Sequence, residues 1–261
     1  MGSSAQQLAA SCPRLILPIG TTLLRPIHSL SLMPLHTLQR LSPTAVLGLW
    51  HLTETPTDLW RALPQPEAYR ALVPATADAT RQAQWLAGRV LAHELLRSTG
   101  TADEAGVVVH NDATGRPWLA GGGVHSALSL SHSGVWVAAV LAQGARVGID
   151  VEMIRDKAQR LASKFLNADE WAAAQAAAPA AHASAPAHYT LLWSAKETLY
   201  KLAGQRGIVF KTQLLLGTFE PGESGEIPAT LVVGGAHTRH CICYSQPSPG
   251  YVLTYSHQSD P

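Results

Sequence analysis

The stretch RVGIDVEMI, residues 146–154, has the two-residue alternation of a β-strand. Its apolar side chains share one face, so Asp150 and Glu152 lie next to each other on the opposite face. Two carboxylates held this close raise each other's pKa unless a cation or a proton lies between them. A solvated strand face is the alternative. The stretch therefore leads to the hypothesis of a cation site.

The apolar segment before this stretch, residues 135–142, predicts a second strand. A turn at Gln143–Gly144 would join it to residues 146–154 as an antiparallel hairpin. That pairing would set apolar residues opposite the acidic ones, which weakens the alternative of a solvated face. It would also bring Glu152 beside the loop that holds Ser131–His132, although most single histidines of this kind have a structural role.

Strands and helices alternate on both sides of this region and predict an α/β fold of the α+β type. Helical spacing extends from Asp78, a suitable N-cap, to Gly100, a suitable stop. A second helical stretch, residues 160–175, has a break near Asn167, where Asp169 can cap the next turn. The other predicted elements are a helix at 189–204, an exposed loop at 176–188, and strands at 45–53, 106–110, 127–131, 212–220, 228–235, 240–246 and 250–257.

Two predicted helices, one from Trp85 and one from Trp193, both begin with tryptophan and precede a run of strands. This faint internal repeat predicts two similar α/β lobes related by a pseudo-twofold axis. We expect an N-terminal lobe at residues 44–147 and a C-terminal lobe at residues 148–257.

The first 53 residues contain no Asp or Glu. An organellar transit peptide has such a composition. A translated upstream extension, with Met33 as the true start, has it too, and we favour this second interpretation. Residues 1–43 are therefore expected to form a poorly ordered N-terminal extension.

The composition excludes several classes of function. A net charge of +1 over 261 residues gives no general attraction to nucleic acid or to an acidic membrane surface. No apolar run reaches the roughly 18 residues that a membrane span needs. Three cysteines make neither an even disulfide framework nor a zinc-binding spacing. We expect a soluble cytoplasmic protein.

The helix at 189–204 carries Trp193, Glu197 and Lys201 four residues apart, so the three share one stripe. An exposed Glu–Lys pair is the simpler interpretation, but the tryptophan argues against full exposure. Together with Asp150 and Glu152, Glu197 gives three carboxylates from a strand and a helix. Oxygen ligands of this kind suit Mg²⁺, which commonly also binds substrate phosphates. The set points to phosphoryl chemistry.

Five motifs, in this order and spacing, resemble those of the Sfp-type 4′-phosphopantetheinyl transferases. They are GRP at 115–117, LSLSHSGVWVAAVL at 128–141, VGIDVE at 147–152, FLNADEW at 165–171 and LWSAKETLYKLAG at 192–204. The closing strand GYVLTYSH at 250–257 fits as well, so the resemblance covers roughly residues 45–257.

The resemblance implies a two-lobed, monomeric enzyme of the holo-acyl-carrier-protein synthase type. It would transfer 4′-phosphopantetheine from coenzyme A to a serine of an apo acyl or peptidyl carrier protein and release 3′,5′-ADP. Carriers of fatty-acid, polyketide and nonribosomal-peptide synthesis all present such a serine. The resemblance also implies a Mg²⁺ ion held by Asp150, Glu152 and Glu197.

Further roles follow from the resemblance by position. Coenzyme A would be bound by Gly115, Arg116, Pro117, Ser131, His132, Asp150 and Lys201, with Arg81 and Arg89 as candidates for its 3′-phosphate. Lys201 would also stabilise the departing phosphate oxygens. Either Glu170 or Glu197 would be the general base. Two alternatives stay open, a Mg²⁺-dependent nucleotide hydrolase and a non-catalytic carrier-binding module.

Overall fold

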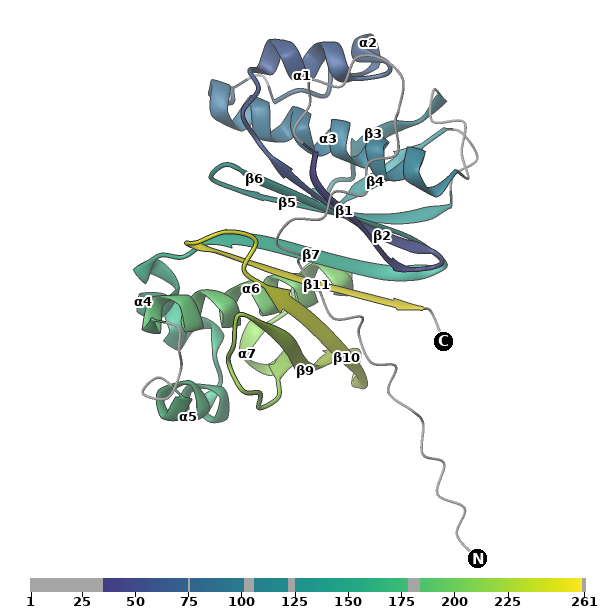
Figure 1. The fold of residues 1–261 in the computed structure, drawn as a ribbon. Helices are drawn as coiled ribbons and strands as arrows, with labels where there is room; N and C mark the ends of the chain where they lie inside the picture. The colour runs from purple at the N-terminus through teal and green to yellow at the C-terminus, as the bar shows by residue number, and fades with distance from the viewer. Residues whose placement is uncertain (1–34, 75, 101–105, 122–124, 178–183, 260–261) are drawn as a thin grey trace, which may run out of the picture.

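The computed structural model describes residues 35–259, except 75, 101–105, 122–124 and 178–183. Within this part, two sheets lie face to face, and each carries helices on its outer side (Figure 1). The predicted mixed α/β class is confirmed. The shared core between the sheets includes Leu47 and Val140 from one layer and Ile149 and Leu253 from the other.

The first sheet is antiparallel, with the strand order β1-β2-β6-β5. Helix α3 packs on its outer face (Figure 1). The elements of this layer are β1 (Leu35–Ser42), β2 (Ala45–His51), α1 (Pro56–Ala62), α2 (Pro66–Tyr69), α3 (Ala79–Thr99), the two-stranded ribbon β3 (Val108–Asn111) and β4 (Pro117–Ala120), β5 (Ser126–Ser133) and β6 (Trp136–Gln143). Asp78 and Gly100 cap α3 at its two ends, as predicted.

The second sheet has the order β7-β11-β10-β9-β8, and α6 packs on its outer face. Its elements are β7 (Ala145–Met153), α4 (Asp156–Phe165), α5 (Ala168–Ala177), α6 (Ala185–Ala203), α7 (Phe210–Gln213), β8 (Leu214–Leu216), β9 (Ser224–Val233), β10 (Ala236–Ser245) and β11 (Tyr251–Ser259). Strand β7 lies at the edge of this sheet, and β5 lies at the edge of the first.

The predicted hairpin of β6 and β7 is wrong. β6 pairs with β2 and β5, whereas β7 pairs with β11. The physical reason is that β6 is buried on both faces, so it occupies the middle of its own sheet. Gly144, with a φ of 59°, instead turns the chain from one layer into the other.

Three local predictions differ from the structure. Residues 35–42, part of the predicted N-terminal extension, form β1, which pairs with β2; residues 1–34 lie outside the described part. The break near Asn167 is real, but Asn167 itself caps α5 in place of Asp169, since its Oδ1 accepts the backbone N–H of Glu170 at 2.9 Å. Helix α6 begins at Ala185, inside the predicted loop. The lobe boundary at residue 148 stays a prediction.

Helix α6 approaches β7 most closely at Gly148. A Cβ at this position would clash with the carbonyl oxygen of Thr198 and would lie 3.2 Å from the backbone nitrogen of Leu202. Only a residue without a side chain allows this approach. Gly148 thereby brings the helix that carries Glu197 and Lys201 against the strand that carries Asp150.

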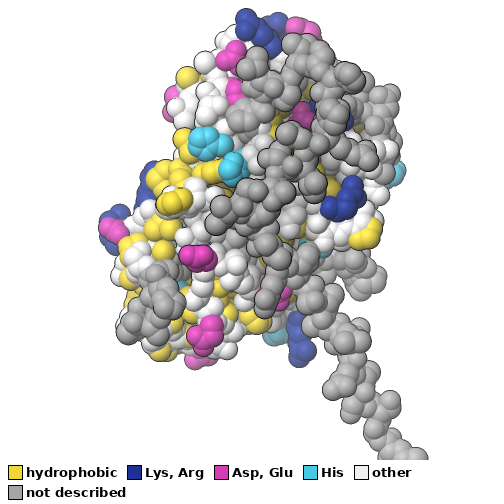
Figure 2. Space-filling model, viewed as in Figure 1, with side chains coloured by type: hydrophobic (Ala, Val, Ile, Leu, Met, Phe, Trp, Pro, Cys, Tyr) yellow, Lys and Arg dark blue, Asp and Glu magenta, His cyan; other side chains and the backbone are white. Residues whose placement is uncertain are grey.

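Charged side chains are scattered over the described part of the face seen in Figure 2, with no broad patch of one sign. This distribution agrees with the small net charge. No described helix combines the length and the apolar character that crossing a membrane would require.

Candidate active site

Asp150 and Lys201 form the central ion pair of the site. Nζ of Lys201 donates to Oδ1 of Asp150 at 2.8 Å and to the carbonyl oxygen of Ile149 at 2.8 Å. Ser131 donates to the same carboxylate oxygen at 2.9 Å. The pair joins α6 to β7, and Asp150 is only 4% exposed.

Glu152 lies two residues further along β7, and its carboxylate is bound by neutral donors. Nε1 of Trp193 donates to Oε1 at 3.2 Å, and Oγ of Ser133 donates to Oε2 at 3.3 Å. Burial and the neighbouring Asp150 raise the pKa of Glu152, and the two hydrogen bonds oppose this. The predicted adjacency of the two strand carboxylates is therefore present.

Glu197 completes the acidic group from α6. Burial, followed by the charge of Asp150, raises its pKa to about 7; Glu152 adds to this and Lys201 opposes it. A carboxyl group with this pKa exchanges a proton near neutral pH, which is the property that a general base needs.

The three carboxylates supply the oxygen ligands that a hard cation prefers. Their present spacing, however, is wider than a metal site requires. Among the described residues, no three His, Cys, Asp or Glu side chains lie close enough to hold a metal ion together. Lys201 already occupies one oxygen of Asp150. The other, Oδ2, is buried and has no hydrogen-bond partner in the described part of the chain. An orphaned carboxylate oxygen beside two further carboxylates is suited to Mg²⁺, which takes oxygen ligands.

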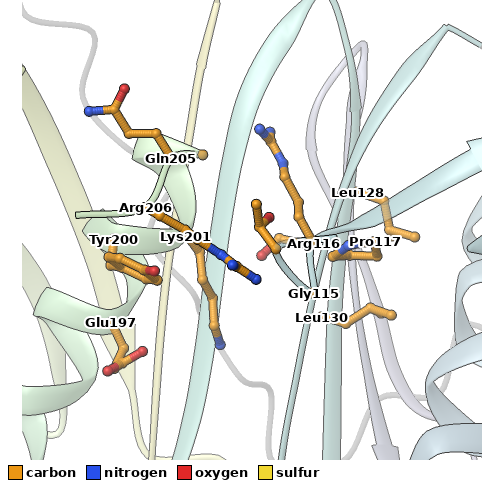
Figure 3. Close-up of a pocket in the computed structure, with 13 residues that line it drawn as sticks. Gly115, Arg116, Pro117, Leu128, Leu130, Glu197, Tyr200, Lys201, Gln205 and Arg206 are labelled. Atoms are coloured by element: carbon orange, nitrogen blue, oxygen red, sulfur yellow. The ribbon is translucent and has the colours of Figure 1, made fainter. Parts of the chain in front are cut away.

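A pocket of about 190 Å³ opens beside this group (Figure 3). The turn between β3 and β4 and strand β5 form one wall, and the C-terminal end of α6 forms the other. Arg116, Lys201 and Arg206 line it, while Glu197 supplies the only carboxylate among its lining residues. Lys201 is paired with Asp150, and the remaining two arginines against one acid favour an anionic ligand.

The predicted GRP motif, Gly115 to Pro117, lies in the wall formed by the turn between β3 and β4. Its turn is held by Asp112, whose Oδ1 accepts the backbone N–H groups of Thr114 at 2.7 Å and Arg116 at 3.0 Å. The guanidinium of Arg116 lies over Gly204, at the end of α6. The motif therefore contacts both walls of the pocket.

Arg89 stabilises the same turn from behind. It is 5% exposed, stacks on Trp85 with 3.7 Å from its Cζ to the ring centroid, and donates to Oδ1 of Asn111. Asn111 in turn donates to the carbonyl oxygen of Gly115 at 2.6 Å. Burial lowers the pKa of Arg89 to about 10. These contacts favour a supporting role for Arg89 over direct binding of a phosphate.

His132 and Arg81 lie on the exposed side of the site. Partial burial lowers the pKa of His132, and three cations nearby lower it further. They are Lys201, Arg81 and Arg89. Ser131, by contrast, is 9% exposed, and its hydroxyl is engaged by β7.

Glu170, the other candidate base, is buried in a separate network. Nζ of Lys196 donates to its Oε2 at 2.6 Å, and the backbone N–H of Asn167 donates to the same oxygen at 2.9 Å. The backbone N–H of Leu216 donates to Oε1 at 2.8 Å. Lys196 is fully buried and also donates to the carbonyl oxygen of Phe210. Both oxygens of Glu170 are thus engaged in holding α5, α6 and β8 together.

Sequence reasoning missed Arg206, Lys196 and Ser133. Arg206 follows the end of α6 in an irregular segment and donates to the carbonyl oxygen of Ala113 across the pocket. No periodic pattern marks such a residue. Lys196 and Ser133 stood inside quoted motifs, but helix and strand spacing does not identify a partner on another element.

Comparison with known proteins gives a family for the second sheet and its helices. Residues 146–256 match the model of the 4′-phosphopantetheinyl transferase superfamily. The chain is also 32% identical, over 136 residues, to a protein named 4′-phosphopantetheinyl transferase AcpT in Salmonella typhi and to its counterpart of the same name in Salmonella typhimurium. The match spans 51% of this chain and 65% of the length of each relative. Residues 146–256 are therefore similar to the 4′-phosphopantetheinyl transferase superfamily.

Proposed function

We propose that this protein transfers 4′-phosphopantetheine from coenzyme A to a serine of an apo acyl or peptidyl carrier protein. The observation that carries the proposal is the Lys201–Asp150 ion pair beside Glu197, at the edge of a cationic pocket. The family match at residues 146–256 supports the same chemistry. We also propose that the second lobe begins at residue 148 and that the protein acts as a monomer in the cytoplasm.

The pocket would take the nucleotide end of coenzyme A. Arg116 and Arg206 would bind its phosphates from opposite walls, and Arg81 would extend this cationic surface outward. His132, whose pKa is lowered, would contribute a neutral imidazole that can form a hydrogen bond. Asp150, Glu152 and Glu197 would hold Mg²⁺, which when bound spreads the negative charge on the pyrophosphate.

The reaction would be a substitution at phosphorus. The hydroxyl oxygen of the carrier serine forms a bond to the phosphorus that bears pantetheine, and the bond from this phosphorus to the bridging oxygen breaks. The bridging oxygen leaves with 3′,5′-ADP. Glu197 would accept the serine proton, because its carboxylate faces the pocket. Lys201 would stabilise the charge on the departing phosphate.

The test is to incubate the protein with apo-carrier, coenzyme A and Mg²⁺ and to measure the mass of the carrier. We expect a gain of one phosphopantetheine group with the wild type and none with Asp150→Ala. A matched reaction without carrier measures free 3′,5′-ADP. Release of 3′,5′-ADP without carrier, together with no gain in carrier mass, would show that the protein is a hydrolase and not a transferase.

A further inference from the structure

The carboxylate of Glu152 is held at both oxygens by neutral donors from two different elements. Trp193 on α6 binds Oε1 at 3.2 Å, and Ser133 on β5 binds Oε2 at 3.3 Å. Asp150, in contrast, is held by the cation Lys201 at 2.8 Å. Glu152 is therefore oriented by hydrogen bonds that leave its negative charge uncompensated.

The orientation of the Ser133 hydroxyl is fixed by β7. Three alternate serines of β5 face the edge of β7, and each accepts one backbone N–H from it. The bonds are Ile149 to Ser129 at 3.2 Å, Val151 to Ser131 at 3.3 Å and Met153 to Ser133 at 3.1 Å. We call these residues the serine ladder.

Each hydroxyl of the ladder keeps one proton to donate. Ser131 gives its proton to Asp150, and Ser133 gives its proton to Glu152. Ser129 has the same bond to β7, but no bond from it to a carboxylate is found in the described part of the chain. The ladder thus contains two members that reach the acidic group and one member that supports the strand alone.

The indole of Trp193 is fixed by packing. Its ring lies edge-on to Phe165, with 5.2 Å between centroids, and stacks on Phe210 at 5.6 Å. The N–H therefore has one direction in which to point, toward Glu152.

We infer that Ser133 and Trp193 are positioning residues, which orient the Glu152 carboxylate for a divalent cation without neutralising it. This inference rests on the proposed function, because it names what prepares one ligand of the cation site. Donors behind a metal ligand set its direction, and their loss typically weakens metal binding by about 10- to 100-fold.

The experiment measures metal binding rather than turnover. Mn²⁺ is titrated into the protein with saturating coenzyme A, and free Mn²⁺ is counted by its electron paramagnetic resonance signal. We expect Ser133→Ala and Trp193→Phe each to raise the Kd for Mn²⁺ by about tenfold. Ser133→Thr keeps the hydroxyl and should restore binding to within about twofold of the wild type. Far-UV circular dichroism and Tm verify that each variant is folded.

Ser129→Ala is the matched control, since it removes one bond to β7 but none to a carboxylate. Because Ser129 also lines the pocket, saturation with coenzyme A is verified for this variant before the Mn²⁺ titration. We expect its Kd for Mn²⁺ to equal that of the wild type even where Tm falls. Equal weakening by Ser129→Ala and Ser133→Ala would overturn the inference, because the ladder would then act only through the strand. Wild-type affinity in both Ser133→Ala and Trp193→Phe would overturn it as well, yet leave the transferase proposal intact. Absence of Mn²⁺ binding by the wild type would remove the cation site itself.

Discussion

The two oxygens of Asp150 have different surroundings, and this difference matters at the scale of single residues. Oδ1 accepts from Lys201 and Ser131, whereas Oδ2 is buried without a partner among the described residues. A buried acceptor left unsatisfied costs about 1–3 kcal/mol. Asp150 therefore has a physical reason to bind a cation, which a solvated carboxylate on an exposed strand would lack.

Glu197 should make the stability of the protein depend on pH. Its pKa is about 7 when folded and about 4.5 for the ordinary group, so the folded state holds a proton that the unfolded state has lost. The resulting stability is complete below about pH 4.5 and is lost as the pH rises through 7. Between pH 5 and pH 7.5 we expect the free energy of unfolding to fall by about 1–2 kcal/mol more in the wild type than in Glu197→Gln. This value is smaller than the full pKa shift would give, because the side chain is partly exposed.

This difference is measurable by urea unfolding in the presence of a chelator. Glu197→Gln is the control, because it keeps the shape of the side chain but does not titrate. Parallel stability curves for the two proteins would contradict the raised pKa of Glu197. Added Mg²⁺ should recover the wild-type loss at pH 7.5.

Substitutions of the two candidate bases, Glu170 and Glu197, should have different effects on kcat and on Tm. Glu170→Gln breaks a buried ion pair and leaves Lys196 uncompensated, which costs about 3–5 kcal/mol. We expect it to lower Tm strongly but to keep kcat within a few-fold at a temperature where it is folded. Glu197→Gln should keep Tm and lower kcat by about 100-fold or more. Mass-detected transfer and thermal melts on the two variants decide this, and the opposite pattern would make Glu170 the base.

At the scale of elements, the packing of α6 on β7 decides which residues meet. Gly148 faces the backbone of α6, and the hydroxyls of Ser194 and Thr198 bind Thr254 on the neighbouring strand β11 at 2.9 and 2.6 Å. Glycine and small hydroxyl residues permit the short distance between helix and sheet. Glu197 and Lys201 reach β7 for this reason.

Gly148→Ala should therefore lower the free energy of unfolding. The added methyl would meet the carbonyl oxygen of Thr198, and backbone cannot move aside as a flexible side chain can. We expect a loss of about 1–3 kcal/mol in urea unfolding. Gly88→Ala is the matched control, since its new Cβ would lie 3.7 Å from Leu130 and 3.9 Å from Val137 in ordinary contact. This control should be neutral or more stable, because alanine favours the helix. Equal losses in both variants would contradict the close approach at Gly148.

Local elements were predictable from the sequence, whereas their partners were not. The capped helix from Asp78 to Gly100 followed from spacing and end residues alone. The hairpin of β6 and β7 failed because a turn at Gly144 suits both a hairpin and a change of layer, and strand alternation does not distinguish them. Only the burial of both faces of β6, a property of the folded state, excludes the pairing.

At the scale of the whole molecule, the pocket depends on contacts between segments far apart in the chain. Arg206, after α6, binds the carbonyl oxygen of Ala113 in the turn between β3 and β4. Arg116, from that turn, lies over Gly204. The motifs predicted Arg116 by resemblance, but Arg206 has no motif. Its role comes from the tertiary arrangement alone.

Loss of Arg206 should weaken coenzyme A binding without unfolding the protein. Arg206 is exposed, so Arg206→Ala should leave Tm nearly unchanged. Removal of one hydrogen-bonded cation from a phosphate site should raise the KM for coenzyme A by about tenfold. Arg160→Ala on α4, which removes an exposed arginine that does not line the pocket, is the control and should keep the wild-type KM. An unchanged KM in Arg206→Ala would place the phosphates elsewhere.

The serine ladder also bears on solubility. A strand at the edge of a sheet offers unpaired N–H groups, which can recruit a strand from another molecule and begin aggregation. In β7 the amides of Ile149, Val151 and Met153 are already bound by hydroxyl groups of the opposing layer. Side chains thus protect this strand against intermolecular addition, a task that many proteins leave to charged residues, prolines or bulges. An edge guarded in this way can keep its acidic residues free for a ligand.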